Sequence, residues 1–138
     1  MREDSTARIK EYKVKTLGSK KTVEALDEAI PNDEAIHYIA PATVNFFIPD
    51  QTTKLQSVGA IAVGDSNFYV MNMLNLAEPQ VYPLADLLYI DYKASGLMAS
   101  QFTMIFKGEL TMTFDGCTNR ECAKRMCQAI KALAPAVP

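Results

Sequence analysis

The sequence has one histidine, no long apolar run and none of the short motifs that mark the common enzyme classes. No window of its 138 residues approaches the roughly 18 apolar residues of a membrane-spanning helix, so no such helix is expected. Met1–Lys10 is charged and no apolar stretch follows it, which argues against a signal peptide. Because Gly-x-Ser-x-Gly elements, phosphate-binding loops and dinucleotide fingerprints are also missing, we expect a cytoplasmic protein that is not an enzyme.

The scarcity of histidine and cysteine limits metal and redox chemistry. His37 lies in a predicted strand beside Ile36 and Ile39, and a general base or a two-histidine metal site would need partners that the sequence lacks. Cys122 and Cys127 fall about 140° apart on a helix, so they cannot hold one ion together. Without a secretory context, three cysteines indicate reduced thiols, and Cys127 is expected in the core. No metal and no cofactor is therefore expected.

The segment Gly64-Asp65-Ser66 has two interpretations. It resembles the start of a block found in lipase-like hydrolases, but such an enzyme needs a downstream Asp-x-x-His, and His37 lies upstream. The same residues, followed by Asn67, are typical of a tight turn between two strands. We favour the turn, which predicts a β-hairpin here.

The charge of the chain is small in total and uneven in distribution. The net charge is −2, with seven Lys/Arg against three acids (+4) in residues 1–21 and seven against thirteen (−6) in the remainder. This asymmetry indicates either a basic arm that contacts anionic surfaces or a solvated, flexible basic leader over residues 1–18. The candidate anionic-surface contacts are Lys10, Lys13, Lys15, Lys20 and Lys21. Tyr12 is the only aromatic residue there, so nucleic acid is not an expected partner.

The clearest local pattern is a hairpin followed by an amphipathic helix near the C-terminal end. Gln101–Phe106 and Glu109–Phe114 alternate apolar and polar side chains around Lys107-Gly108, which predicts two strands with one buried face. Thr118 and Glu121 have the spacing of a helix capping box. The helix is needed to cover the apolar face, because a two-stranded hairpin is not stable alone. The side chains expected in the core are Phe102, Met104, Phe106, Leu110, Met112, Phe114, Met126, Ile130 and Leu133.

The preceding part of the chain predicts a short helix and five further strands. Ser19–Ile30 places Val23 and Leu26 on one helical face, and Pro31-Asn32-Asp33 ends the helix. The strands are expected at about Ala35–Ile48, Ser57–Val63, Phe68–Leu74, Gln80–Tyr82 and Asp86–Tyr92. A mass of 15.3 kDa and 49% apolar residues suit one core, so we expect one domain over residues 19–134. Seven short, regularly spaced strands are typical of a sandwich or barrel.

Three segments resemble bacterial pleckstrin-homology-like (PH-like) domains of the YokE type. Leu26–Ile36 is similar to the helix and acidic approach to their first strand, and Gly59–Val70 to their first hairpin. Val81–Leu84 together with Leu87–Ile90 resembles the segment that follows. The turn at Asp65–Asn67 departs from the family pattern, in which threonine is commonly followed by a basic residue.

The resemblance covers about residues 24–134 and has implications for both fold and function. It implies a mainly β, PH-like seven-stranded barrel or orthogonal sandwich with a C-terminal capping α-helix and a short N-terminal helix. Such domains are generally non-enzymatic, and some form homo-oligomers through exposed sheet edges. In the wider superfold, phosphoinositides bind several Lys/Arg at the loop between the first two strands. That loop here offers only Lys54, with Asp50 close by, so specific phosphoinositide binding is not expected.

Together these features predict a non-catalytic interaction module that binds another protein or itself through an open sheet edge. Leu97 and Met98 place two large apolar side chains in a loop, where they either form a contact patch or fold over the barrel mouth. Lys54, Leu97 and Met98 are the candidate partner-binding residues. The alternative is weak binding to anionic membranes through the five N-terminal lysines. A small-ligand barrel ranks last, because the inward strand positions are mainly Phe, Met, Leu and Val.

Overall fold

A computed structural model describes residues 1–49, 55–95, 98–116 and 120–138, without the side chains at 94, 95, 98 and 99. In chain order the elements are α1 (Glu3–Glu11), α2 (Lys20–Ala29), β1 (Ile36–Phe47), β2 (Leu55–Gly64), β3 (Asn67–Asn72), β4 (Gln80–Pro83), the 3-10 turn η1 (Leu84–Asp86), β5 (Leu87–Ser95), β6 (Met98–Phe106), β7 (Leu110–Asp115) and α3 (Arg120–Leu133). The predicted strands and both predicted helices are present, with ends that differ by a few residues. The predicted capping residue Thr118 lies outside the described residues.

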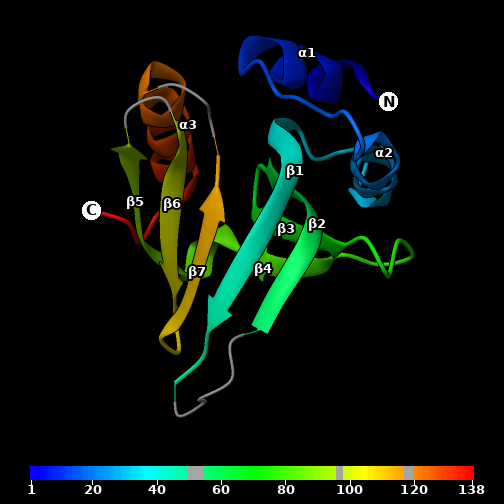
Figure 1. Cartoon of the computed structure of the whole chain (residues 1–138). Coiled ribbons are helices and arrows are strands. Elements are labelled where there is room, and N and C mark those ends of the chain that lie inside the picture. The colour runs from blue at the N-terminus through cyan, green and yellow to red at the C-terminus, as the bar shows by residue number, and fades with distance from the viewer. Residues whose placement is uncertain (50–54, 96–97, 117–119) are drawn as a thin grey trace.

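The seven strands form one antiparallel sheet in the order β4-β3-β2-β1-β7-β6-β5. β1 joins the two halves of the sheet, because it pairs with β2 along most of its length and with β7 from Val44 to Phe47. In Figure 1 the strands β1–β4 lie beside the group β5–β7, and α3 runs along the latter. The phenyl rings of Phe68 in β3 and Phe114 in β7 stack with centroids 5.6 Å apart, so the two groups face each other. This arrangement confirms the predicted mainly β fold with a C-terminal helix.

The main hydrophobic core lies between the two groups of strands and α3. Phe102, Met104 and Phe106 alternate along β6 and are all buried, as the period-two pattern predicts. From α3, Met126 and Ile130 complete this core. Of the side chains predicted to be buried here, Leu110 and Leu133 are only partly covered. The covering role predicted for the C-terminal helix is therefore confirmed.

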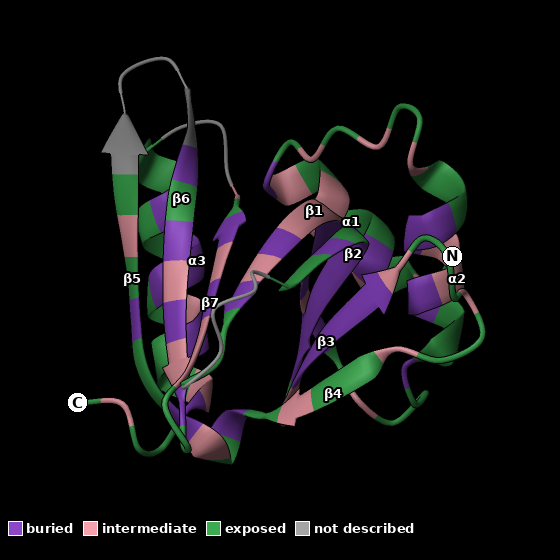
Figure 2. Cartoon of the chain, turned by 60° about the horizontal axis from the view of Figure 1, so that its bottom comes forward, coloured by how far each residue is buried: buried purple, intermediate pink, exposed green. Residues whose placement is uncertain are grey.

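A second, smaller core lies on the opposite face of β1–β3, under α2. Val23 and Leu26 project from α2 onto Ile39 of β1, Ala62 of β2 and Met71 of β3. Figure 2 shows the consequence, because β3 and residues 59–64 of β2 are largely buried while α2 keeps an exposed side. Strands covered on both faces read as continuous apolar runs, which is why residues 60–64 and 68–71 lack alternation.

The N-terminal segment, expected to be a flexible basic leader that is irregular or helical only in part, contains the helix α1. α1 packs on β1, and Ser5 and Tyr12 are buried. The Tyr12 ring meets Tyr38 edge to face at 5.2 Å between centroids, and Arg125 of α3 lies 5.4 Å from the same ring. The sequence of α1 is polar and has no apolar stripe, so tertiary contacts rather than amphipathicity hold this helix. The domain boundary predicted between residues 18 and 19 stays a prediction.

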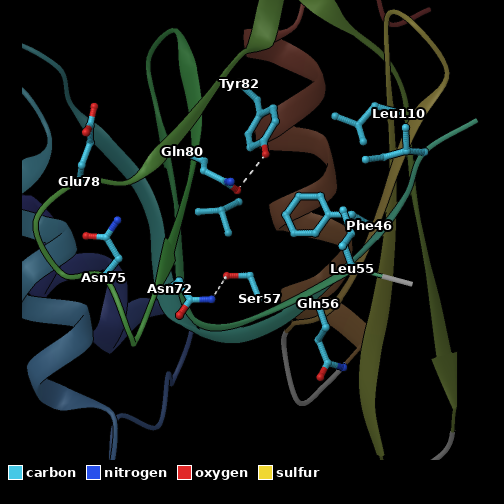
Figure 3. Close-up of a pocket in the computed structure, with 12 residues that line it drawn as sticks. Phe46, Leu55, Gln56, Ser57, Asn72, Asn75, Glu78, Gln80, Tyr82 and Leu110 are labelled. Atoms are coloured by element: carbon cyan, nitrogen blue, oxygen red, sulfur yellow. Dashed lines mark hydrogen bonds between the residues drawn. The ribbon is translucent and has the colours of Figure 1, made fainter. Parts of the chain in front are cut away.

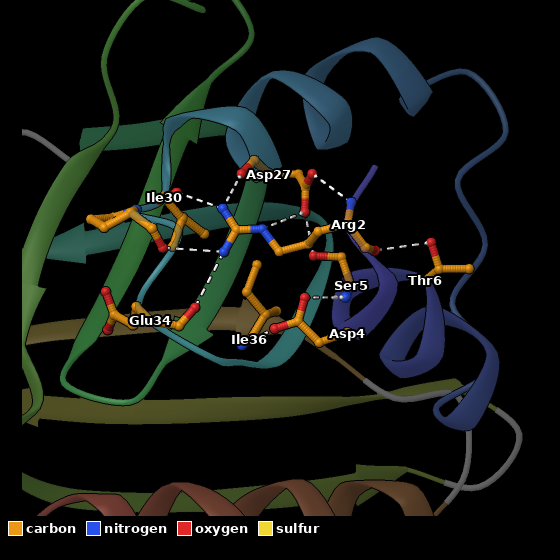
Figure 4. A network of polar contacts seen from close by, with 9 residues as sticks. Arg2, Asp4, Ser5, Thr6, Asp27, Ile30, Glu34 and Ile36 are labelled. Carbon is orange, nitrogen blue, oxygen red and sulfur yellow. Dashed lines mark hydrogen bonds and ion pairs between the residues drawn. The ribbon is translucent and has the colours of Figure 1, made fainter.

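Arg2 attaches α1 to the end of α2 (Figure 4). Its guanidinium donates to the carbonyl oxygens of Asp27 at 2.9 Å and Ile30 at 2.5 Å, in the last turn of α2. It also donates to those of Pro31 and Glu34, both at 3.2 Å. The last carbonyls of a helix have no partners within it, so Arg2 supplies the missing donors. Its Nε lies 3.5 Å from the buried Asp27 carboxylate, which adds an ion pair.

Candidate functional site

A pocket of about 380 Å³ opens where the end of β1, the start of β2 and the β3–β4 loop meet β4 (Figure 3). Small-ligand sites usually have volumes of about 300–1,000 Å³, so this pocket is large enough for a small molecule. Separate segments supply its lining, and no sequence motif marks it. The lining residues are Phe46, Ile48, Leu55, Gln56, Ser57, Val70, Asn72, Asn75, Glu78, Gln80, Tyr82 and Leu110.

The inner wall of the pocket is apolar because the strands alternate. Phe46 in β1 and Val70 in β3 face the main core and are buried, and Leu110 at the start of β7 is half-buried. Gln80 and Tyr82 are two residues apart in β4, so both face the pocket. The Tyr82 ring lies 6.3 Å from that of Phe46, and burial raises the pKa of its hydroxyl. The phenol therefore stays neutral at physiological pH.

Side-chain amides and one hydroxyl line the rest of the pocket. Asn72 donates from Nδ2 to Ser57 Oγ at 3.3 Å, and its Oδ1 accepts the backbone N–H of Leu74 at 2.8 Å. Across the pocket the hydroxyl of Tyr82 donates to Gln80 Oε1 at 3.0 Å. Both side-chain pairs are visible in Figure 3, on opposite sides of the opening. These contacts orient neutral polar groups toward an otherwise apolar space.

The charge of this lining is negative. Among the lining residues that the structure describes, Glu78 is the one acidic residue, and no lysine or arginine contributes. Lys54 and Leu97, two of the predicted partner-binding residues, lie outside the described residues. The third, Met98, begins β6, but its side chain is not described. The predicted contact patch is thus neither found nor excluded.

The two edge strands carry exposed apolar side chains. Val81 in β4 and Leu88 and Tyr89 in β5 are 50%, 41% and 44% exposed. β4 and β5 are the two ends of the sheet in the described part of the chain, so neither pairs with a strand on its outer side. α3 covers part of the β5 edge, since the Cys127 thiol lies 4.0 Å from the carbonyl oxygen of Ile90 and donates to it.

The five candidate lysines of the N-terminal segment all have exposed side chains. Lys10 lies in the last turn of α1, and Lys20 pairs with Glu24 at 3.9 Å on the surface of α2. Lys13 and Lys15 line a smaller hollow of about 130 Å³ with Tyr38 and other residues of β1. Lys13 and Lys15 are therefore close to the beginning of β1, whereas the larger pocket lies at the end of β1.

The turn between β2 and β3 is held by two carboxylates. Asp65 accepts the backbone N–H of Ala35 at 2.8 Å and lies 2.7 Å from His37 Nε2. The hydrogen bond with His37, followed by that from Ala35, lowers the pKa of Asp65. Glu34 accepts the backbone N–H of Ser66 at 2.9 Å. The predicted tight turn is confirmed, and His37 takes part in joining it to the α2–β1 loop.

Within the described ranges, no group of three or more His, Cys, Asp and Glu side chains is arranged to hold a metal ion. Cys122 and Cys127 are both buried on α3, and Cys127 takes the predicted core position. Among the helices of the described residues, none has the length and apolar character needed to cross a membrane.

Comparison with solved structures identifies the fold. The PH domain of USP37 aligns with 72% of this chain and 94% of its own length, at 14% identity and a TM-score of 0.50. An activated truncation of Vav1 aligns with 95% of this chain at 10% identity and a TM-score of 0.55. Vav1 bound to an allosteric inhibitor aligns with 93% at 11% identity and a TM-score of 0.52. This chain spans 35% and 34% of the two Vav1 chains.

The chain therefore has a PH-like fold. No family model matches the sequence, and no curated protein is similar to it. At these low identities the likeness concerns the fold alone, and the predicted YokE type is a finer assignment than the solved structures support. The pocket residues were not foreseen from the sequence. The sequence contains one indication of the pocket. Gln80 lies two residues before Tyr82 on the inward face of a predicted strand, where an apolar residue is usual.

Proposed function

We propose that this chain is a non-catalytic PH-like module of the bacterial YokE type that binds protein, including a second copy of itself. One observation carries the proposal: the strands at both ends of the described sheet, β4 and β5, carry exposed apolar side chains. An unpaired strand edge offers backbone donors and acceptors to an extended segment of another chain. A cytoplasmic location belongs to the same proposal.

β5 is the better edge for such pairing. It has nine residues, whereas β4 has four and ends in Pro83, which cannot donate a backbone hydrogen bond. α3 covers β5 near Ile90. The accessible part of β5 therefore includes Leu88 and Tyr89, which precede Ile90 and are exposed. Leu97 and Met98 follow β5 in the sequence, and Lys54 precedes β2. We retain these three residues as proposed additional contacts.

Size-exclusion chromatography with light scattering tests the self-association. At high micromolar concentration we expect a mass above 15.3 kDa. Leu88→Lys should shift the equilibrium toward the monomer, because lysine on an edge strand opposes edge pairing. Leu17→Lys is the matched control, since Leu17 is 100% exposed and lies between the helices α1 and α2. A strict monomer at every concentration, or equal effects of both variants, would count against self-association through β5.

A second candidate function is weak binding to anionic membranes. The observation that favours it is the exposure of Lys10, Lys13, Lys15, Lys20 and Lys21. Lys13 and Tyr38 line the same smaller hollow. The exposed Phe47 ends the strand that holds Tyr38, and at about 3.3 Å per residue it lies up to about 30 Å from Tyr38. Phe47 is therefore distant from these lysines, and attraction between exposed lysines and an anionic surface is screened by salt, so we expect weak binding.

Co-sedimentation with phosphatidylserine vesicles at two salt concentrations separates the two functions. Electrostatic binding should be present at low salt and lost at high salt. Replacing Lys13 and Lys15 by glutamate should abolish it, whereas Lys131→Glu on the exposed side of α3 serves as the control. Absence of sedimentation at low salt would exclude the membrane function and leave the protein-binding proposal in place.

A further inference from the structure

We propose that the pocket beside β4 binds a small uncharged molecule that combines an apolar body with a hydrogen-bond acceptor such as a carbonyl oxygen. The space of about 380 Å³ opens on the inner side of β4, toward the main core. The proposed protein contact uses the outer edge of β5. The two proposals therefore concern different surfaces, and either can fail without the other.

The acceptor oxygens of three of the amides in the pocket, those of Asn72, Asn75 and Gln80, are already in use. Asn72 Oδ1 accepts the N–H of Leu74 at 2.8 Å, and Asn75 Oδ1 accepts the N–H of Ala77 at 3.3 Å. A backbone N–H can only donate, so these bonds fix which side-chain atom is oxygen and which is nitrogen. What these three amides still offer to a ligand is therefore N–H donors.

Ser57 is the most informative donor in the pocket. It is 7% exposed, it lines the pocket, and its Oγ accepts a hydrogen bond from Asn72 Nδ2 at 3.3 Å. The hydroxyl proton must then point away from that amide, and among the residues that the structure describes it has no acceptor. A buried donor without an acceptor is unfavourable. A ligand carbonyl in the pocket would satisfy it.

The charge of the lining argues for a neutral ligand. Glu78 supplies a negative charge at the opening, and no cation lines the described part of the pocket. A carboxylate or phosphate would lose its hydration without gaining a cationic partner among the described residues, which is costly in a partly buried site. A cation would gain Glu78 but would meet the N–H and O–H donors deeper in the pocket. A neutral acceptor avoids both penalties.

The remaining walls fit an apolar body. Phe46, Val70 and the Tyr82 ring form the inner surface, and Leu110 closes one side. Burial of apolar surface would supply most of the affinity at about 25 cal/mol per Å². The hydrogen bond to Ser57 would then orient the ligand and select it against molecules that lack an acceptor.

Titration followed by ¹H–¹⁵N NMR with three probes of similar shape tests the inference. Acetophenone carries a neutral acceptor, benzoate a negative charge, and benzamidine a positive charge with donors only. Acetophenone should bind at least about threefold more tightly than either, which is within the effect of one hydrogen bond. The shifted signals should include the backbone of Ser57 and the side-chain amides of Asn72 and Gln80. Tighter binding of benzoate or benzamidine, or no localised shift with acetophenone, would overturn the proposal.

Two variants test which side chains determine the selectivity among the three probes. Ser57→Ala should weaken acetophenone binding about three- to tenfold while benzamidine binding changes little. Glu78→Gln should strengthen benzoate binding about two- to fivefold, since it removes one repulsive charge near the surface, and leave acetophenone unchanged. Glu28→Gln, an exposed acid on α2, is the matched control and should affect no probe. The same NMR spectra show whether each variant is folded, so a loss of binding is distinguished from a loss of the fold. Equal losses for all three probes in Ser57→Ala would reject the assigned hydrogen bond.

Discussion

At the residue scale, Arg2 makes the most consequential polar contacts of the described chain. Arg2→Ala removes the donors to four carbonyl groups and leaves the Asp27 carboxylate, whose side chain is 5% exposed, without its cation. We expect the free energy of unfolding to fall by about 2–4 kcal/mol, because a buried charge then lacks a partner. Urea denaturation measures the change. Arg120→Ala, at an exposed position on α3, should change it by less than about 0.5 kcal/mol. Similar losses in the two variants would mean that the guanidinium contacts contribute nothing.

Tyr69 gives the protein a specific sensitivity to alkali. Burial, followed by the hydrogen bond from its hydroxyl to Glu34, raises the pKa of Tyr69 from 10.0 to about 12. The folded state thus favours the neutral phenol, so the contribution of Tyr69 to stability is complete below pH 10 and is lost as the pH rises through 12.

Tyr69→Phe should therefore lose less stability than the wild type between about pH 9 and about pH 11. Urea denaturation at the two pH values gives the difference, and Tyr92→Phe, on the half-exposed Tyr92, controls for the loss of a phenol elsewhere in the sheet. The assignment fails if both variants lose as much stability as the wild type.

Single residues were predictable from the sequence where a periodic pattern decided their environment. Phe102 and Cys127 are buried as expected, because strand and helix periods place them on covered faces. Arg2 and Ser57 were not foreseen, since their roles depend on partners 25 or more and 15 positions away in the chain. Such long-range polar contacts leave no local pattern in one sequence.

At the element scale, α3 protects the outer edge of β5. The thiol of Cys127 donates to the Ile90 carbonyl at 4.0 Å, and burial raises the pKa of this thiol. A raised pKa leaves less thiolate at neutral pH, so alkylation should be slow. We expect native Cys127 to react with N-ethylmaleimide at least about 100-fold more slowly than in urea, as measured by peptide mass mapping.

The matched control for this experiment is a cysteine at the next position. Gln128 is exposed on α3, so the thiol of Gln128→Cys should react at nearly the unfolded rate. If native Cys127 reacted as quickly as this introduced thiol, α3 would have to separate from β5 in solution. The β5 edge would then be open along more of its length than the structure indicates.

The elements themselves were largely predictable, and α1 shows why one was missed. The hairpin of β6 and β7 and the stripe of α3 each carry a regular apolar period and recognisable turn residues. Seven of the nine residues of α1 are polar or charged and two, Ala7 and Ile9, are apolar, so the helix lacks a stripe that would predict burial. Its position follows from Tyr12 and Arg2, which flank it in the sequence and contact distant elements.

At the scale of the whole molecule, the sheet carries two cores, one on each face of β1–β3. The alternating hairpin and the helical stripe predicted the larger core, between the strands and α3, and the solved PH structure agrees with the predicted fold. The smaller core, under α2, is closed by contacts that include Ile9 of α1. The N-terminal helix is thus packed against both the smaller core and, through Tyr12, the larger one. Whether residues 1–18 act as a leader or as part of the domain is a question of how much these contacts stabilise the fold.

Removal of residues 1–12 distinguishes an integral helix from a leader. The deletion removes Tyr12, which is 6% exposed, together with Ile9 and Arg2, so we expect the free energy of unfolding to fall by at least about 3 kcal/mol. Urea denaturation measures the loss, and Tyr12→Ala alone should account for about 2–4 kcal/mol of it even where the shortened chain does not fold. Leu17→Ala, at a fully exposed position between α1 and α2, is the control and should have little effect. An unchanged midpoint in the shortened chain would restore the flexible leader, whose lysines would then be free to contact an anionic surface.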